Sequence, residues 1–122
     1  MVLIKMKAGN LKRGDIVLVT FEPVIGAEQG KVRPAIVIQN DILNKFSPLT
    51  IVAPVTSKVY EKEYPTNVFI KKEDSALKKD STILLNQIRT IDKRRIINKL
   101  GVLDNFTMNK VDRALKVSLA LD

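Results

Sequence analysis

The sequence predicts a mainly β protein: a small, strongly bent sheet or barrel of short strands with a helix packed on it. Short runs rich in β-branched residues, separated by glycine, proline and polar residues, occupy most of the chain up to Ile91. Residues 106–121 instead repeat apolar side chains at helical spacing. The chain has 122 residues, the length of one domain, and shows no internal repeat, low-complexity segment or linker. We therefore expect a single domain over residues 1–122.

The composition limits the chemistry that the protein can use. It has no cysteine and no histidine, so disulfides, thiolate sites and the usual imidazole metal ligands are excluded, and we expect no metal and no cofactor. Catalysis would have to use Arg, Lys, Asp, Glu, Tyr, Ser or Thr. The 21 basic and 13 acidic residues give a net charge of +8, which favours nucleic acid, an anionic membrane surface or an acidic protein partner.

The N-terminal sequence and the hydropathy pattern predict the location. The start, MVLIKMKAGNLKRGD, has few apolar residues before Lys5 and no cleavage-site pattern, which argues against a signal peptide. No apolar run approaches the roughly 18 residues of a membrane span. We therefore expect a soluble, cytoplasmic protein without membrane contact.

The first half of the chain is expected to form three strands. Residues 15–21 (DIVLVTF) and 35–39 (AIVIQ) are apolar on both faces, which predicts buried strands. Residues 49–55 (LTIVAPV) predict a third strand, where Pro54 marks an edge, a bulge or the strand's end because proline cannot donate to a ladder. Residues 1–11 show no clear period and are expected to form an irregular or strand-like lead.

The second half is expected to contain shorter strands. Residues 66–71 and 81–85 are strand candidates, and residues 86–91 predict another strand. Between the first two, residues 71–80 (KKEDSALKKD) predict a polar connection or one helical turn.

The end of the chain changes to helical character. Residues 93–100 predict a short helix, and Asp104 stands where an N-cap belongs before the terminal helix. The expected inward face of that amphipathic helix consists of Met108, Val111, Leu115, Ser118 and Leu119.

Residues 22–40 (EPVIGAEQGKVRPAIVIQN) are the principal functional candidate, a glycine-containing loop between two strands. Arg33 stands at its exit, and Pro34 pushes Arg33 toward an extended backbone. The guanidinium is planar, permanently charged and suited to bidentate contact with phosphate oxygens. The alternative is a surface arginine paired with Glu22 or Glu28.

Several other side chains have two interpretations each. Thr56, at the end of its strand, either hydrogen-bonds an oxyanion or caps the next turn, and the same holds for Ser57. Glu28 and Gln29 either contact base edges or are solvated loop residues. Phe46 either stacks on a base or covers the core.

Basic residues recur outside these candidates, at Lys71, Lys72, Lys78, Lys79, Lys93, Arg94 and Arg95. Together they attract a polyanion, but individually they specify nothing. The run at 93–95 is either a solvated helix face or a substrate contact.

Five segments of the chain, in order, resemble the MazF/PemK family of toxin endoribonucleases. They are RGDIVLVTFEPVIGAEQGKVRPAIVIQND, PLTIVAPVTS, PTNVFI, DSTILLNQIRTIDKRRI and DNFTMNKVDRALKVSLAL, and they cover nearly the whole chain from Leu11 onward. The specific signal is the combination of EQG-x-VRP, a threonine after an apolar strand, and QIRTID; one of these alone would be weak.

The resemblance implies a small SH3-like (MazF/PemK-like) barrel of short, mostly antiparallel strands with a C-terminal amphipathic α-helix. It also implies a homodimer that cleaves single-stranded RNA, such as mRNA, at short sequences without metal. The family's catalytic arginine matches Arg33 in VRP, and its catalytic threonine matches Thr56 in PVTS. In the family the substrate 2′-hydroxyl attacks the adjacent phosphorus, leaving a 2′,3′-cyclic phosphate or 3′-phosphate and a 5′-hydroxyl.

This chemistry suits the residue inventory, because a nucleophile supplied by the substrate requires none from the protein. We expect Arg33 to stabilise developing charge or donate a proton, since arginine stays protonated and is a poor base. Thr56 is expected to hydrogen-bond the phosphate, and Glu28 is the candidate base. The expected substrate-binding residues are Ala27, Glu28, Gln29, Phe46, Ser57, Asn86 and Gln87.

The chain departs from its relatives at two of these positions. Relatives often have serine where Ala27 stands and an acidic residue where Asn86 stands. Both changes remove groups that would touch bases, so we expect a different cleavage sequence with activity retained.

The family also implies an antitoxin whose acidic and apolar tail blocks the basic groove, which the net charge of +8 favours. One alternative is a non-enzymatic toxin of the same fold that binds gyrase, although those proteins use a tryptophan near the end and this chain has none. Another is a plain RNA-binding module.

Overall fold

The computed structural model describes residues 10–21 and 32–122. Its elements are β1 (Asp15–Thr20), β2 (Val32–Val37), α1 (Asp41–Phe46), β3 (Leu49–Thr56), β4 (Asn67–Ile70), β5 (Ser81–Leu84), β6 (Arg89–Asp92), β7 (Ile96–Val102) and α2 (Asn105–Ser118). Two 3₁₀ turns lie at Lys72–Asp74 and Lys93–Arg95.

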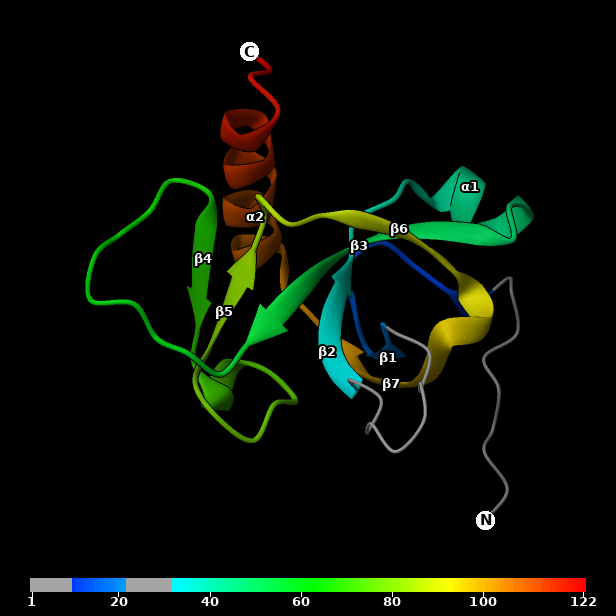
Figure 1. Ribbon diagram of the computed structural model, residues 1–122, viewed down its shortest axis with the longest axis horizontal. Helices are drawn as coiled ribbons and strands as arrows, with labels where there is room; N and C mark the ends of the chain where they lie inside the picture. Colours follow the sequence, from blue (N-terminus) through cyan, green and yellow to red (C-terminus); the bar gives the residue numbers. More distant parts are fainter. Residues whose placement is uncertain (1–9, 22–31) are drawn as a thin grey trace, which may run out of the picture.

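All the strand pairs are antiparallel, and they follow the order β4-β5-β3-β2-β1-β7 with β6 on β3. Within residues 10–21 and 32–122 this path does not close, because β4 and β7 are its two ends. Figure 1 shows β4 and β5 beside α2 on one side and β1, β2 and β7 on the other, with β3 crossing between them. The predicted mostly antiparallel sheet with a terminal helix is confirmed.

The central strands β1, β2 and β3 are buried on both faces. Ile16, Ile36 and Ala53 belong to the core cluster that α2 joins through Val111 and Ala114. An adjacent residue on each strand points to the other face, so that Val17, Val37 and Val52 form part of a second cluster. Full burial of one such aliphatic side chain stabilises the fold by about 1.5–3 kcal/mol. This two-sided burial explains why these runs are apolar throughout.

The terminal helix begins where the sequence predicts. Asp104 is its N-cap, and its carboxylate accepts a hydrogen bond from the Thr107 N–H at 2.7 Å. The expected inward position of Leu119 is wrong: this residue is the C-cap, and 50% of its surface is exposed because the helix ends at Ser118. In the described part of the chain, neither helix has the length and apolarity needed to cross a membrane.

The sequence-based assignment differs from the structure at two helices. The helix predicted at residues 93–100 is wrong, because a 3₁₀ turn capped by Asp92 leads into β7, which pairs with β1. Strand pairing with a distant segment therefore overrides the local pattern. Helix α1 was not predicted; it begins where the side chain of Asn40 accepts from the Leu43 N–H at 2.9 Å.

Candidate active site

The strand pairing brings Arg33 and Thr56 together. The β2–β3 ladder ends with Ala35 opposite Pro54, so Arg33 and Thr56 each lie two residues beyond its last pair, at the same end of the two strands. Both side chains line one cavity of about 580 Å³. Two residues that are far apart in the sequence thus meet at one end of the sheet.

The lining of this Arg33–Thr56 cavity combines positive charge, hydroxyls and an apolar surface. Its polar residues are Arg33, Thr56, Ser57, Lys78, Lys79 and Ser81, and its apolar residues are Leu18, Pro34, Val55, Ala76, Leu77 and Leu100. No carboxylate of the described residues lines it. The uncompensated cations favour an anion such as a phosphate, and the apolar surface suits a ribose or a base.

The backbone of Arg33 is held by the pairing of β2 with β1. Arg33 lies within β2, opposite Val19 of β1, and its side chain is exposed. The predicted extended backbone before Pro34 is confirmed. None of the ion pairs among residues 10–21 and 32–122 involves Arg33. Glu22 and Glu28, its alternative partners, lie outside the described residues.

Thr56 does form the cap that was one of its two interpretations. The Lys58 N–H donates to Thr56 Oγ1 at 3.2 Å. Thr82 Oγ1 donates to the Lys58 carbonyl at 2.8 Å, which holds the same turn from β5. Because Thr56 Oγ1 accepts in this cap, its own proton is available to donate to a phosphate oxygen. The cap orients the hydroxyl without occupying its donor.

The other candidate residues are distributed unevenly around this site. Ser57 is exposed and lines the Arg33–Thr56 cavity. Asn86 and Gln87 are exposed in the turn between β5 and β6 and do not line it. Three more candidates, Ala27, Glu28 and Gln29, lie outside the described residues.

Phe46 lies far from Thr56 within this chain. It is the last residue of α1 and lies near the start of β3, whereas Thr56 is the last residue of that strand. At 3.3 Å per residue, the two ends of β3 are about 23 Å apart. The ring is 75% exposed, so the interpretation that it covers the core is wrong. Lys45 Nζ lies 5.3 Å from the ring centroid. An exposed ring remains able to stack on a base, but not beside Arg33 of the same chain.

The basic run at 93–95 is engaged within the fold and does not line the cavity. The hydrogen bonds from Arg94 lower the pKa of Asp92 to about 2. Lys93 Nζ donates to the Asn44 carbonyl, and burial lowers the pKa of Lys93. The side chain of Arg95 donates to the Thr20 carbonyl at 3.3 Å. These contacts favour a structural role for the run.

Sequence reasoning missed the contribution of the β4–β5 connection. Lys78 and Lys79 were interpreted as part of a dispersed positive charge, yet both line the cavity with Arg33. No local signal marks them, because their neighbours in the cavity come from β2, β3 and β7. Only the strand order places this connection there.

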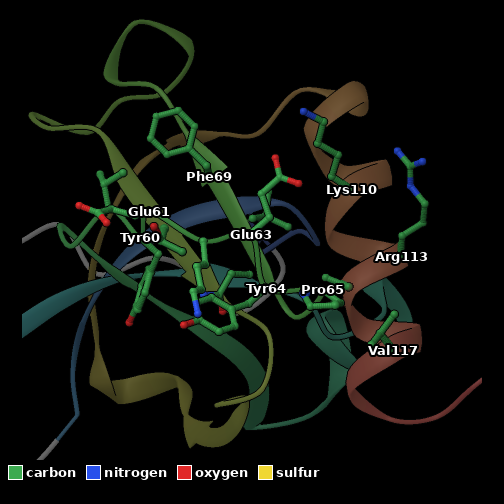
Figure 2. A pocket seen from close by; sticks show the side chains of 15 residues that line it. Tyr60, Glu61, Glu63, Tyr64, Pro65, Phe69, Lys110, Arg113 and Val117 are labelled. Carbon is green, nitrogen blue, oxygen red and sulfur yellow. The ribbon is translucent and has the colours of Figure 1, made fainter.

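A larger cavity, of about 740 Å³, lies elsewhere, between α2, β4 and the β3–β4 connection. Figure 2 shows the helix that carries Lys110, Arg113 and Val117 beside Pro65 and the strand that carries Phe69, with the Arg113 side chain pointing away from Tyr64. Glu61 and Glu63 also line it, so its cations are accompanied by carboxylates. It contains neither Arg33 nor Thr56. Volume alone would therefore select the cavity less suited to a phosphate.

Metal ligation has no candidate in the described ranges. Residues 10–21 and 32–122 hold no group of three or more Asp or Glu side chains placed to bind a metal ion. The chemistry available in the Arg33–Thr56 cavity is therefore that of a guanidinium, ammonium groups and hydroxyls.

Comparison with known proteins identifies the family of this chain. The family model described as "PemK-like, MazF-like toxin of type II toxin-antitoxin system" matches residues 12–119. Endoribonuclease EndoA of Bacillus subtilis (strain 168) is 51% identical over 111 residues, which cover 91% of this chain and 96% of that protein.

Solved structures share the fold. A MazE-MazF crystal structure from Deinococcus radiodurans has a TM-score of 0.76 at 27% identity, covering 92% of this chain and 97% of that chain. An endoribonuclease from mycobacterial species has a TM-score of 0.76 at 22% identity, covering 95% of each chain. The resemblance predicted from the sequence is confirmed: the chain belongs to the PemK-like, MazF-like toxins of type II toxin-antitoxin systems.

Proposed function

We propose that this chain is the endoribonuclease toxin of a toxin-antitoxin pair and that it cleaves single-stranded RNA in the Arg33–Thr56 cavity. Its family and its 51% identity to an endoribonuclease support the activity. The proposed location of the reaction is supported by one observation: Arg33 and Thr56 line the same cavity, and its described lining carries no carboxylate.

The reaction uses a nucleophile from the substrate. The 2′-oxygen of one ribose forms a bond to the adjacent phosphorus while the bond from phosphorus to the 5′-oxygen breaks. The 2′-hydroxyl gives up its proton, and the departing 5′-oxygen gains one. The products are a 2′,3′-cyclic phosphate, which water opens to a 3′-phosphate, and a 5′-hydroxyl.

Arg33 stabilises the charge that develops on the non-bridging phosphate oxygens. Its guanidinium can donate two parallel hydrogen bonds, and its backbone is held by pairing with β1. Arginine stays protonated, so it serves as an electrostatic partner or proton donor and not as the base. Thr56 donates its free hydroxyl proton to the same phosphate. Glu28 is the proposed base and lies outside the described residues.

Partners and location follow from the same proposal. The protein acts as a homodimer in the cytoplasm and binds an antitoxin with an acidic, apolar tail. The net charge of +8 favours such a tail, and the Deinococcus radiodurans structure is of a MazE-MazF pair.

The test is cleavage of a long, unstructured RNA by the purified protein in EDTA, with the 5′ ends of the products mapped. We expect 5′-hydroxyl ends at a short recurring sequence. Arg33→Ala should lower the rate by at least about a hundredfold while the protein stays folded. The matched control is Arg94→Ala, because Arg94 is an exposed arginine that lines neither cavity.

Three results would contradict the proposal. One is intact RNA with the wild-type protein, and another is a wild-type rate for Arg33→Ala. The third is inhibition of gyrase supercoiling without RNA cleavage, which would favour the non-enzymatic toxin.

A further inference from the structure

We infer that the β4–β5 connection, residues 71–80, forms a second wall of the RNA site. In this wall Lys78 and Lys79 bind phosphates adjacent to the one held by Arg33, and Gly101 positions the wall. The inference rests on the proposed function, because it assigns more of the substrate contact to the same cavity.

The two lysines face the site from an element that carries neither Arg33 nor Thr56. Both line the Arg33–Thr56 cavity, and both are exposed. Neither belongs to an ion pair within the described part of the chain. The adjacent carboxylate of Asp80 instead accepts a hydrogen bond from the Lys72 N–H at 2.9 Å. Their positive charge is therefore available to an anion that binds in the cavity.

Three cations in one cavity exceed what a single phosphate requires. An RNA strand carries one negative charge per nucleotide, so a strand crossing the cavity presents neighbouring phosphates to neighbouring cations. The planar guanidinium of Arg33 and the hydroxyl of Thr56, which line the same cavity, suit the reacting phosphate. The flexible ammonium groups of Lys78 and Lys79 suit point contacts to the flanking phosphates.

The β4–β5 connection packs against the core and is held by hydrogen bonds. Leu77 packs against the core cluster, as does Leu100 of β7. The Leu77 N–H donates to Ser75 Oγ at 3.2 Å, and Ser81 Oγ donates to the Lys79 carbonyl at 2.9 Å. The lysine backbones are thus held on both sides, and only the side chains have freedom to follow the RNA.

Gly101 of β7 lies directly against Ala76 of this wall. A Cβ built on Gly101 would lie 2.8 Å from the Cβ of Ala76, which is closer than two such carbons can approach. The backbone does not require glycine here, because among the described glycines only Gly14 has a positive φ. The missing side chain is therefore what lets Ala76 rest against β7 and places the following lysines over the cavity.

The charge part is tested by binding of a single-stranded oligonucleotide with deoxyribose throughout, which lacks the nucleophile. The affinity falls as the salt concentration rises, and Lys78→Gln and Lys79→Gln should each reduce the steepness of log K against log salt by about 0.7. With RNA, each should raise KM while kcat changes little. The matched control is Lys71→Gln/Lys72→Gln, which removes two charges from the same connection but not from the cavity. The dependence of log K on log salt should be steeper for this control than for Lys78→Gln/Lys79→Gln.

The positioning part is tested by exchanging the two small residues. Gly101→Ala should push residues 76–79 outward, raise KM and lower the salt slope without removing any charge. Gly101→Ala/Ala76→Gly moves the methyl group to the other side of the contact and should restore both values. Thermal melting of each variant separates this rescue from a change in folding.

Equal salt slopes for the Lys78/Lys79 and Lys71/Lys72 double variants would overturn the inference. A Gly101→Ala protein with the KM and slope of the wild type would overturn the positioning role. Failure of the proposed function looks different: the wild-type protein would then leave RNA intact, while the slopes on the deoxyribose oligonucleotide would still distinguish the lysines.

Discussion

The two cavities differ in charge more than in size. The larger one, about 740 Å³, brings Lys62, Lys110 and Arg113 together with Glu61 and Glu63. The smaller one, about 580 Å³, has Arg33, Lys78 and Lys79 and no carboxylate among its described lining residues. Phosphate chemistry requires positive charge that the protein has not already neutralised. The comparison therefore favours the smaller cavity for the proposed reaction.

The cavities also differ in how the fold positions their side chains. Arg33 and Thr56 lie on adjacent, paired strands, each two residues beyond the last pair of their ladder. The larger cavity is formed between a helix, a strand and the β3–β4 connection, so no single ladder fixes its polar groups. A reaction that depends on the placement of donors to within a fraction of an ångström favours the paired strands.

Removal of the Thr56 hydroxyl should have the largest effect of the substitutions that follow. Thr56→Val deletes one donor to the phosphate and should lower kcat by about a hundredfold. Thr56→Ser keeps the hydroxyl and its cap and should retain most of the activity. Single-turnover cleavage of the mapped RNA sequence gives both rates. Equal rates for the valine and serine variants would show that the hydroxyl takes no part.

Exchange of one arginine in each cavity compares the two directly. Arg33→Lys keeps the charge but loses the bidentate fork, so we expect a loss of about tenfold or more in kcat/KM. Arg113→Lys, the equivalent change in the larger cavity, should leave RNA cleavage at the wild-type rate. The same cleavage assay measures both variants, and the reverse order of effects would place the reaction in the larger cavity.

A change at the start of α2 should affect stability and leave catalysis alone. The Thr107 N–H bond lowers the pKa of Asp104 below its ordinary 3.8. The folded state thus favours the carboxylate, so the contribution of the cap is full above pH 3.8 and is lost as the pH falls through the lowered value. Asp104→Ala should lower the Tm at pH 7 without changing kcat.

The difference in Tm between Asp104→Ala and the wild type should shrink in acid, which thermal melts at a series of pH values would measure. A difference independent of pH would mean that the charge of the cap contributes nothing. A fall in kcat would show that α2, a wall of the larger cavity, influences the reaction.

The sequence was informative where local chemistry decides the outcome. Apolar runs predicted β1, β2 and β3, since their residues are buried on both faces, and Asp104 marked the start of α2. The VRP and PVTS motifs identified Arg33 and Thr56 as a pair, and in the structure both line one cavity.

The sequence was uninformative where pairing between strands that are distant in the sequence determines the structure. Residues 96–100 were predicted to continue a short helix, but they belong to β7, which pairs with β1. Lys78 and Lys79 look like any exposed lysines until the strand order sets their connection beside β2 and β3. Gly101 has a reason to be glycine only after Ala76 is seen against it.

The most direct test is a crystal structure with an oligonucleotide of the mapped sequence that carries deoxyribose at the cleaved position. The account predicts that the phosphate at this position lies between the Arg33 guanidinium and Thr56 Oγ1, within about 3 Å of both. The flanking phosphates should lie toward Lys78 and Lys79. A scissile phosphate bound in the larger cavity, or one out of hydrogen-bond reach of both Arg33 and Thr56, would contradict it.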